Sequence, residues 1–137
     1  MTDYLVDNSV WARLASGDTA VTERLRLVER TPSDLFVTCP PQVLEFCHSA
    51  RTPVEHALYR ERISLGFPLE RAPDESLVLD IQAALWDSGL VRAAGPVDIL
   101  IAGYAIANDA TVLTADHDFD HIAAVTSLNH EYVTPSL

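Results

Sequence analysis

The chain has 137 residues, a length at which a protein normally forms one core, so we expect a single domain over residues 1–137. Its 20 acidic and 9 basic residues give a net charge of −11, which argues against phosphate-driven binding of long nucleic acids and favours a basic protein partner. No segment approaches the ~18 apolar residues of a membrane span, and the first residues lack the basic region of a secretory signal. We therefore expect a cytoplasmic protein that does not bind membranes.

The first half of the chain alternates short apolar runs with helical patterns. In chain order it predicts a strand over 4–6, a helix over 10–15 capped by Asn8 or Ser9, a helix over 21–30, a strand over 35–38, and helices over 41–50 and 53–65. Pro41 and Pro53 favour the starts of the last two helices, because proline is tolerated at the first helical position. Val54, Leu58 and Ile63 place an apolar side on the helix over 53–65.

The second half continues the alternation. It predicts an edge strand over 67–69, a helix from Asp74 or Glu75 to Asp87, a helix over 97–107, a strand over 111–114, a short helix over 119–124 and a last strand over 125–128. Pro68 indicates an edge position because proline cannot donate a ladder hydrogen bond. The helix over 97–107 is apolar nearly all round, which indicates burial. Cys39 and Cys47 lie among apolar residues and are typical of reduced core thiols.

Short apolar strands that alternate with helices predict an α/β fold, in which a parallel sheet is covered on both faces. Sites in such sheets form outside the carboxyl ends of the strands. This rule points to Asp7, to the helix that carries Glu45, and to Asp116.

The four acids at these places differ in how strongly the local pattern singles them out. Asp7 follows a strand directly, but stabilisation of a helix N-terminus explains it equally well. At ~100° per residue, Glu45 lies opposite the apolar stripe of its helix, so periodicity alone places it on a solvated face. Asp98 stands in the first turn of the apolar helix, where compensation of the helix dipole is the structural alternative.

Asp116 repeats the arrangement of a strand followed by an acid, and Asp118 and Asp120 come closely after it. Like charges so close raise one another's proton affinity unless a cation offsets them. An acidic loop that caps the short helix explains Asp120 without any site. Separate carboxylates at one sheet edge suit Mg²⁺ or Mn²⁺, which can activate a water and stabilise the leaving oxygen of a phosphodiester.

Four segments in series resemble the PIN-domain family. They are residues 4–11 (YLVDNSVW), Leu44-Glu45, residues 97–102 (VDILIA) and residues 112–119 (VLTADHDF). Within that family they are most similar to VapC toxins of type II toxin–antitoxin systems. The similarity runs from Tyr4 to about Ile122, in the family's order and spacing.

This resemblance implies a three-layer α/β/α domain with a central, mostly parallel sheet of four or five strands. It implies a Mg²⁺- or Mn²⁺-dependent endoribonuclease that hydrolyses RNA with a metal-activated water and leaves 5′-phosphate and 3′-hydroxyl ends. It also implies a homodimer that is neutralised by a VapB-like antitoxin, whose tail places a basic side chain among the carboxylates.

The resemblance also assigns roles to residues of this chain. By motif position, the acidic quartet is Asp7, Glu45, Asp98 and Asp116; Asp118 is an accessory acid, and Ser9 and Thr114 are hydroxyls that position the first and last acids. Asp7 and Asp98 are expected as the main metal ligands, Asp116 as a direct or water-mediated ligand, and Glu45 as the group that orients the water. Two departures from the family leave the quartet in place: Asn8 changes only local hydrogen bonding, and Gly103 touches no ligand.

Three other interpretations compete with this one. The chain can have the fold and act only as a non-catalytic binding partner. His117 and His121 stand four residues apart and can form part of a zinc site for a zinc-dependent hydrolase, although no third ligand is evident. A phosphatase that uses Asp116-His117-Asp118 would need this pattern after the first strand, where Asn8 and Ser9 follow Asp7.

Overall fold

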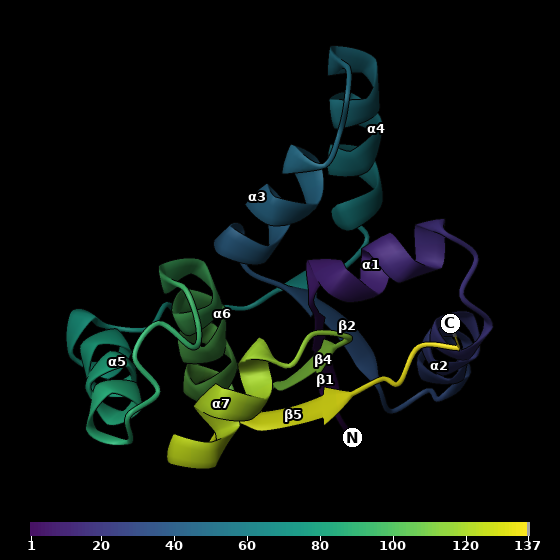
Figure 1. Ribbon diagram of the computed structural model, residues 1–137. Coiled ribbons are helices and arrows are strands. Elements are labelled where there is room, and N and C mark those ends of the chain that lie inside the picture. The colour runs from purple at the N-terminus through teal and green to yellow at the C-terminus, as the bar shows by residue number, and fades with distance from the viewer. Residues whose placement is uncertain (137) are drawn as a thin grey trace.

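The computed structural model describes residues 1–136. Five parallel strands form one sheet in the order β3-β2-β1-β4-β5, with helices between them (Figure 1). In chain order the elements are β1 (Asp3–Val6), α1 (Asn8–Ala15), α2 (Thr19–Arg30), β2 (Leu35–Thr38), α3 (Pro40–His48), α4 (Pro53–Ile63), β3 (Phe67–Pro68), α5 (Glu75–Asp87), α6 (Pro96–Ala107), β4 (Thr111–Thr114), α7 (Asp118–Val125) and β5 (Asn129–Tyr132). The predicted α/β class, with a central, mostly parallel sheet of four or five strands, is confirmed.

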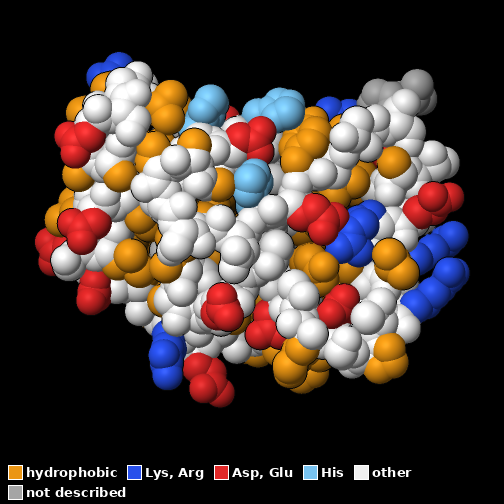
Figure 2. Space-filling model, turned by 90° about the horizontal axis from the view of Figure 1, so that it is seen from below, with side chains coloured by type: hydrophobic (Ala, Val, Ile, Leu, Met, Phe, Trp, Pro, Cys, Tyr) orange, Lys and Arg blue, Asp and Glu red, His pale blue; other side chains and the backbone are white. Residues whose placement is uncertain are grey.

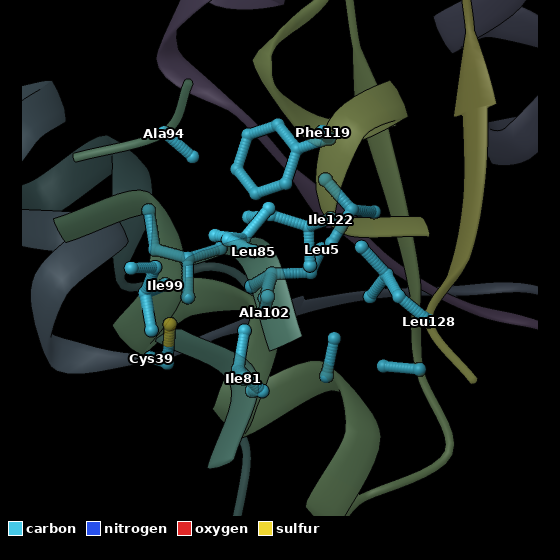
Figure 3. Close-up of a cluster of buried hydrophobic side chains, with 14 of the residues drawn as sticks. Leu5, Cys39, Ile81, Leu85, Ala94, Ile99, Ala102, Phe119, Ile122 and Leu128 are labelled. Atoms are coloured by element: carbon cyan, nitrogen blue, oxygen red, sulfur yellow. The ribbon is translucent and has the colours of Figure 1, made fainter. Parts of the chain in front are cut away.

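Apolar side chains of the central strands alternate between two separate cores. Leu5 and Val112 belong to a core that α5, α6 and α7 cover, and Phe119 and Ile122 of α7 are fully buried there (Figure 3). The other core lies between α1, α2 and the opposite face of the same strands. Because successive residues of the central strands are buried in cores on opposite faces, the sheet has helices on both faces, as the three-layer prediction requires.

Strand register brings the carboxyl ends of the middle strands together. Leu5 of β1 pairs with Val37 of β2 and Val112 of β4, so β1 is the central strand. The edge position expected for Pro68 is confirmed, since β3 pairs only with β2. Helices α3 and α4 extend away from the sheet in Figure 1 and follow directly from the carboxyl end of β2.

Helix starts lie within two residues of the predicted positions, and α1 and α2 each begin two residues earlier. The Asp7 carboxylate caps α1 by accepting from the Ser9 backbone N–H, so the prediction of Asn8 or Ser9 as the cap was wrong. Asp74 caps α5 in the same way, as expected. An acid that ends β1 therefore also begins α1, so the helix N-terminal role of Asp7 is confirmed.

One prediction about an apolar pattern was wrong. The last strand is Asn129–Tyr132 rather than residues 125–128, because Val125 ends α7 and Leu128 is packed in the core. On α4, Val54 and Leu58 are 80% and 41% exposed, whereas Ile63 at the end of the helix is buried.

Helix α6 is buried over most of its length but not all round. Gly103 is buried at a close approach between helices, where an added Cβ would lie 3.0 Å from Cβ of Pro73 and 3.1 Å from Cγ1 of Val78. Glycine at this position thus lets α5 and its preceding segment contact α6 closely. Cys39 and Cys47 are free and buried. Among residues 1–136, no helix is long and apolar enough to cross a bilayer.

Candidate metal-dependent nuclease site

The end of β1 is held by a network of hydroxyl groups around Asp7. Its side chain is buried at 5% exposure. Ser9 Oγ donates to Asp7 Oδ2 over 2.6 Å, and Thr114 Oγ1 lies 3.2 Å from the same oxygen. Ser9 Oγ also accepts from the Ala115 backbone N–H at 2.9 Å. A buried carboxylate needs such donors, and here they come from both central strand ends.

The end of β4 is more open. Asp116 is exposed, and its backbone N–H donates to Thr114 Oγ1 at 3.0 Å. Its carboxylate accepts from the Asp118 backbone N–H at 3.0 Å. The two hydroxyls expected to position the first and last acids therefore both contact Asp7, and Thr114 also fixes the backbone of Asp116.

Asp98 shows the largest electrostatic perturbation of the group. Burial at the start of α6, followed by the nearby charges of Asp7 and Asp118, raises the pKa of Asp98 from 3.8 to about 7. Its carboxyl group shares a hydrogen bond with that of Asp118, whose own pKa is raised by burial and by Asp116. Near neutral pH, Asp98 therefore still holds a proton in part of the molecules.

Glu45 reaches the same region from α3. Burial first, and then the charge of Asp7, raises its pKa, while His48 acts in the opposite direction. The expectation of a fully solvated face was wrong, because Glu45 is half-buried. Its charge also raises the pKa of Asp98.

Gln42 is a residue that the sequence interpretation missed. Its side chain is 1% exposed, Nε2 donates to the Val6 carbonyl at 2.7 Å, and Oε1 accepts from the Cys39 N–H at 3.3 Å. It ties the helix that carries Glu45 to the strand that ends at Asp7. The signal was present, since a glutamine three residues after a helix cap is typical of a capping box.

The structure thus brings all five predicted acids to one edge of the sheet. The electrostatic contacts run from Asp116 to Asp118, from Asp118 to Asp98, and from Asp98 to both Asp7 and Glu45. Among residues 1–136, no three His, Cys, Asp or Glu side chains already stand as a group that could hold a metal ion. The carboxylates are therefore close enough to repel one another, but they are not yet arranged as a complete set of metal ligands.

The acid and histidine cluster beyond Asp118 differs from the expectation. The Asp120 carboxylate accepts from His117 Nδ1 at 2.8 Å and from His130 Nε2 at 2.7 Å. These hydrogen bonds, His117 first, lower the pKa of Asp120, so the expected mutual rise among the three acids was wrong for this one. His117 stacks on Tyr132, whereas the charge of His121 opposes the rise in the pKa of Asp118. The described chain therefore brings no third ligand to His117 and His121.

The donor set suits a hard divalent cation. All the side chains concerned offer carboxylate oxygens, which Mg²⁺ and Mn²⁺ prefer. Burial and the neighbouring carboxylates raise the pKa of Asp98, so a positive charge beside this cluster would stabilise its ionised form. A cation supplies that charge, so the residues fit a divalent metal by their chemistry.

Comparison with protein families agrees with this geometry. The model of the PIN domain matches residues 4–125. The chain belongs to the PIN-domain family. This PIN domain is 34% identical over 135 residues to ribonuclease VapC21 of Mycobacterium tuberculosis, a match that covers 96% of the chain and 94% of the relative. It is 31% identical over 131 residues to VapC ribonuclease Mb1587 of Mycobacterium bovis, covering 90% and 94%.

Solved structures support the fold of this PIN domain. VapBC-1 from nontypeable Haemophilus influenzae matches with a TM-score of 0.74 at 18% identity, over 97% of this chain and 99% of the other. VapBC2 from Rickettsia felis, bound to a DNA fragment from its promoter, matches with a TM-score of 0.74 at 15% identity, over 96% and 98%. The resemblance to the PIN-domain family and to VapC within it is confirmed.

Proposed function

We propose that this PIN domain is a VapC-like endoribonuclease that hydrolyses RNA phosphodiesters with a divalent metal ion, Mg²⁺ or Mn²⁺. The observation that carries the proposal is the convergence of five carboxylates from β1, α3, α6 and the β4–α7 connection, with a pKa of about 7 at Asp98. Relatives named VapC ribonucleases, 31% to 34% identical over nearly the whole chain, support the choice of RNA as substrate.

We assign the residue roles as part of the same proposal. Asp7 and Asp98 would hold the metal ion, and Asp116 would assist directly or through a water. The Asp98 carboxyl, whose pKa is raised by burial and by neighbouring carboxylates, would be ionised more readily beside a positive charge. The ion itself supplies positive charge that activates a water and offsets the charge of the reacting phosphate.

Other side chains orient the reacting groups. Glu45 reaches the cluster from α3. It would accept a hydrogen bond from the attacking water and orient that water toward the phosphorus. Ser9 and Thr114 keep Asp7 Oδ2 in place. Asp118 adds an acid next to Asp98. The water oxygen bonds to phosphorus while the bond from phosphorus to the 3′ oxygen breaks. The 3′ oxygen leaves and takes up a proton, which gives 5′-phosphate and 3′-hydroxyl ends.

Partners form the second part of the proposal. We expect a homodimer that is inhibited by a VapB-like antitoxin, with a basic side chain of the antitoxin placed among the carboxylates. The net charge of −11 and the raised pKa values in the cluster favour such a cationic group. A cytoplasmic location and a single domain over residues 1–137 remain part of this proposal.

The test is cleavage of a labelled structured RNA in Mg²⁺, in Mn²⁺ and in EDTA. We expect cleavage that needs the metal and is abolished by Asp7→Ala and by Asp98→Ala. Asp87→Ala, an exposed acid at the end of α5, is the matched control and should cleave as the wild type does. Activity retained in Asp98→Ala would refute the metal assignment, and a wild type that cleaves no RNA would favour the non-catalytic alternative.

A further inference from the structure

Beside the carboxylates, the ring of His117 is exposed and yet held in place. Its side chain is 69% exposed. One face of the ring stacks on Tyr132, with ring centroids 4.3 Å apart and an interplanar angle of 17°. Nδ1 is hydrogen-bonded to Asp120 at 2.8 Å, and His130 in β5 holds the other Asp120 oxygen at 2.7 Å. We call these four side chains the His117 platform.

The platform lies at the same sheet edge as the carboxylates. His117 stands between Asp116 and Asp118 in the chain, and Tyr132 pairs in register with Thr114 at the carboxyl end of β4. Figure 2 shows histidine side chains next to acidic ones on one face, while most basic side chains lie along one side of that face. A planar ring that is largely open to solvent thus follows directly after Asp116, an acid of the cluster.

Because the protein has few basic residues, RNA binding would need contacts other than charge neutralisation, and the His117 platform offers one. RNA-binding proteins commonly gain affinity from cations that neutralise phosphates, but this chain has 20 acidic and 9 basic residues. Stacking of a base on an aromatic ring needs no net charge and tolerates any base. A ring that is already fixed by Tyr132 and Asp120 loses little conformational freedom when a base lies on it.

We infer that His117, backed by Tyr132, stacks on an unpaired RNA base beside the scissile phosphate and so positions the substrate. This inference rests on the proposed ribonuclease function. It makes His117 a substrate-contacting residue, whereas Asp120 and His130 only hold its ring. The structural alternative is that the four side chains merely fasten α7 to β5.

The first experiment compares His117→Ala and His117→Phe with the wild type on a fluorescein-labelled single-stranded RNA of about 14 nucleotides. Dissociation constants are measured by anisotropy in Ca²⁺ in place of Mg²⁺, and kcat and KM in Mg²⁺. We expect His117→Ala to bind about 5- to 100-fold more weakly, with KM raised alike and kcat changed less than about threefold. His117→Phe keeps a ring and should recover most of the affinity. His56→Ala, an exposed histidine on α4, is the matched control and should bind as the wild type does.

A second experiment separates stacking from folding. The same RNA is prepared with one base removed at each position in turn. At one position the wild type should lose the affinity that His117→Ala has already lost, and His117→Ala should lose nothing more there. Equal losses in both proteins at every position, or His117→Phe as weak as His117→Ala, would overturn the inference. If the wild type cleaves RNA while His117→Ala binds normally, only this inference fails; if the wild type cleaves no RNA, the proposed function itself fails.

Discussion

The two middle strands, β1 and β4, both end in an aspartate, but the two strand ends are built differently. Asp7 is 5% exposed, and its carboxylate accepts hydrogen bonds from Ser9 and Thr114. Asp116 is exposed, and its backbone N–H donates to the Thr114 hydroxyl. The same sequence pattern, a strand followed by an acid, thus gives one rigid and one accessible carboxylate. A rigid ligand defines the geometry of a metal site, and an accessible one can adapt to the substrate or to a water.

The largest effect should separate these two aspartates directly. We expect Asp7→Asn to lower cleavage of labelled RNA by more than about 100-fold, and Asp116→Asn by only about 10-fold. Asparagine can still cap α1, so circular dichroism should show an unchanged fold for Asp7→Asn. Equal losses for both substitutions would mean that the burial of Asp7 has no catalytic consequence.

Removal of the hydroxyl that joins the two strand ends should have the next largest effect. Ser9 Oγ donates to Asp7 and accepts from the Ala115 N–H. We expect Ser9→Ala to lower activity by about 10- to 100-fold and the free energy of unfolding by about 1–2 kcal/mol. Ser64→Ala removes an exposed hydroxyl that donates to the Glu61 carbonyl, and it is the control for both measurements. A Ser9→Ala enzyme with wild-type activity would contradict the role of this network.

The β1 end has a further attachment that the β4 end lacks. Gln42 bonds the Val6 carbonyl and the Cys39 N–H inside the protein. We expect Gln42→Leu to lower the free energy of unfolding by about 2 kcal/mol in urea denaturation, because it leaves two buried backbone groups without partners. Gln82→Leu, at a half-buried position on α5, is the control. If Gln42→Leu is as stable as the wild type, the attachment of α3 to β1 does not depend on this amide.

Stability should also depend on pH in the metal-free protein. The pKa of Asp98 is raised from 3.8 to about 7, so the folded protein keeps a proton that the unfolded chain has lost. The protonated Asp98 carboxyl therefore contributes fully to stability below about pH 4, and this contribution is lost as the pH rises through about 7. In EDTA, the free energy of unfolding of the wild type should therefore fall between about pH 4 and pH 7, and that of Asp98→Asn should fall less. Parallel curves for the two proteins would show that Asp98 is not the titrating group.

Particular residues show how far the sequence predicts this site. Asp7 and Asp116 follow apolar strands, and parallel strands share a carboxyl edge, so their meeting follows from the pattern. Glu45 does not follow from periodicity, because a helix considered alone has no sheet edge beside it. Its approach to Asp7 depends on how α3 leaves β2 and on Gln42, which fastens that helix to β1. Only the resemblance to a family identified it.

The β5 strand shows the opposite limit. Its sequence, NHEY, has no apolar alternation, and its pairing with β4 depends on backbone hydrogen bonds and on side chains that contact other elements. Among these, Glu131 accepts two hydrogen bonds from Arg24 of α2 at 2.6 and 2.9 Å. A hydrophobic pattern does not reveal such a strand, so the strand was predicted at the apolar residues that precede it.

The sequence by itself determined the alternation of strands and helices, and with it the layers, the parallel sheet and the edge at which acids collect, because these depend on local periodicity and chain direction. Tertiary structure decided which acids affect one another, that Asp98 keeps a proton near pH 7, and that Asp120 pairs with His117 and His130 instead of joining the cluster. The physical reason is that burial and charge act through space, between residues as far apart in the chain as Asp7 and Asp98.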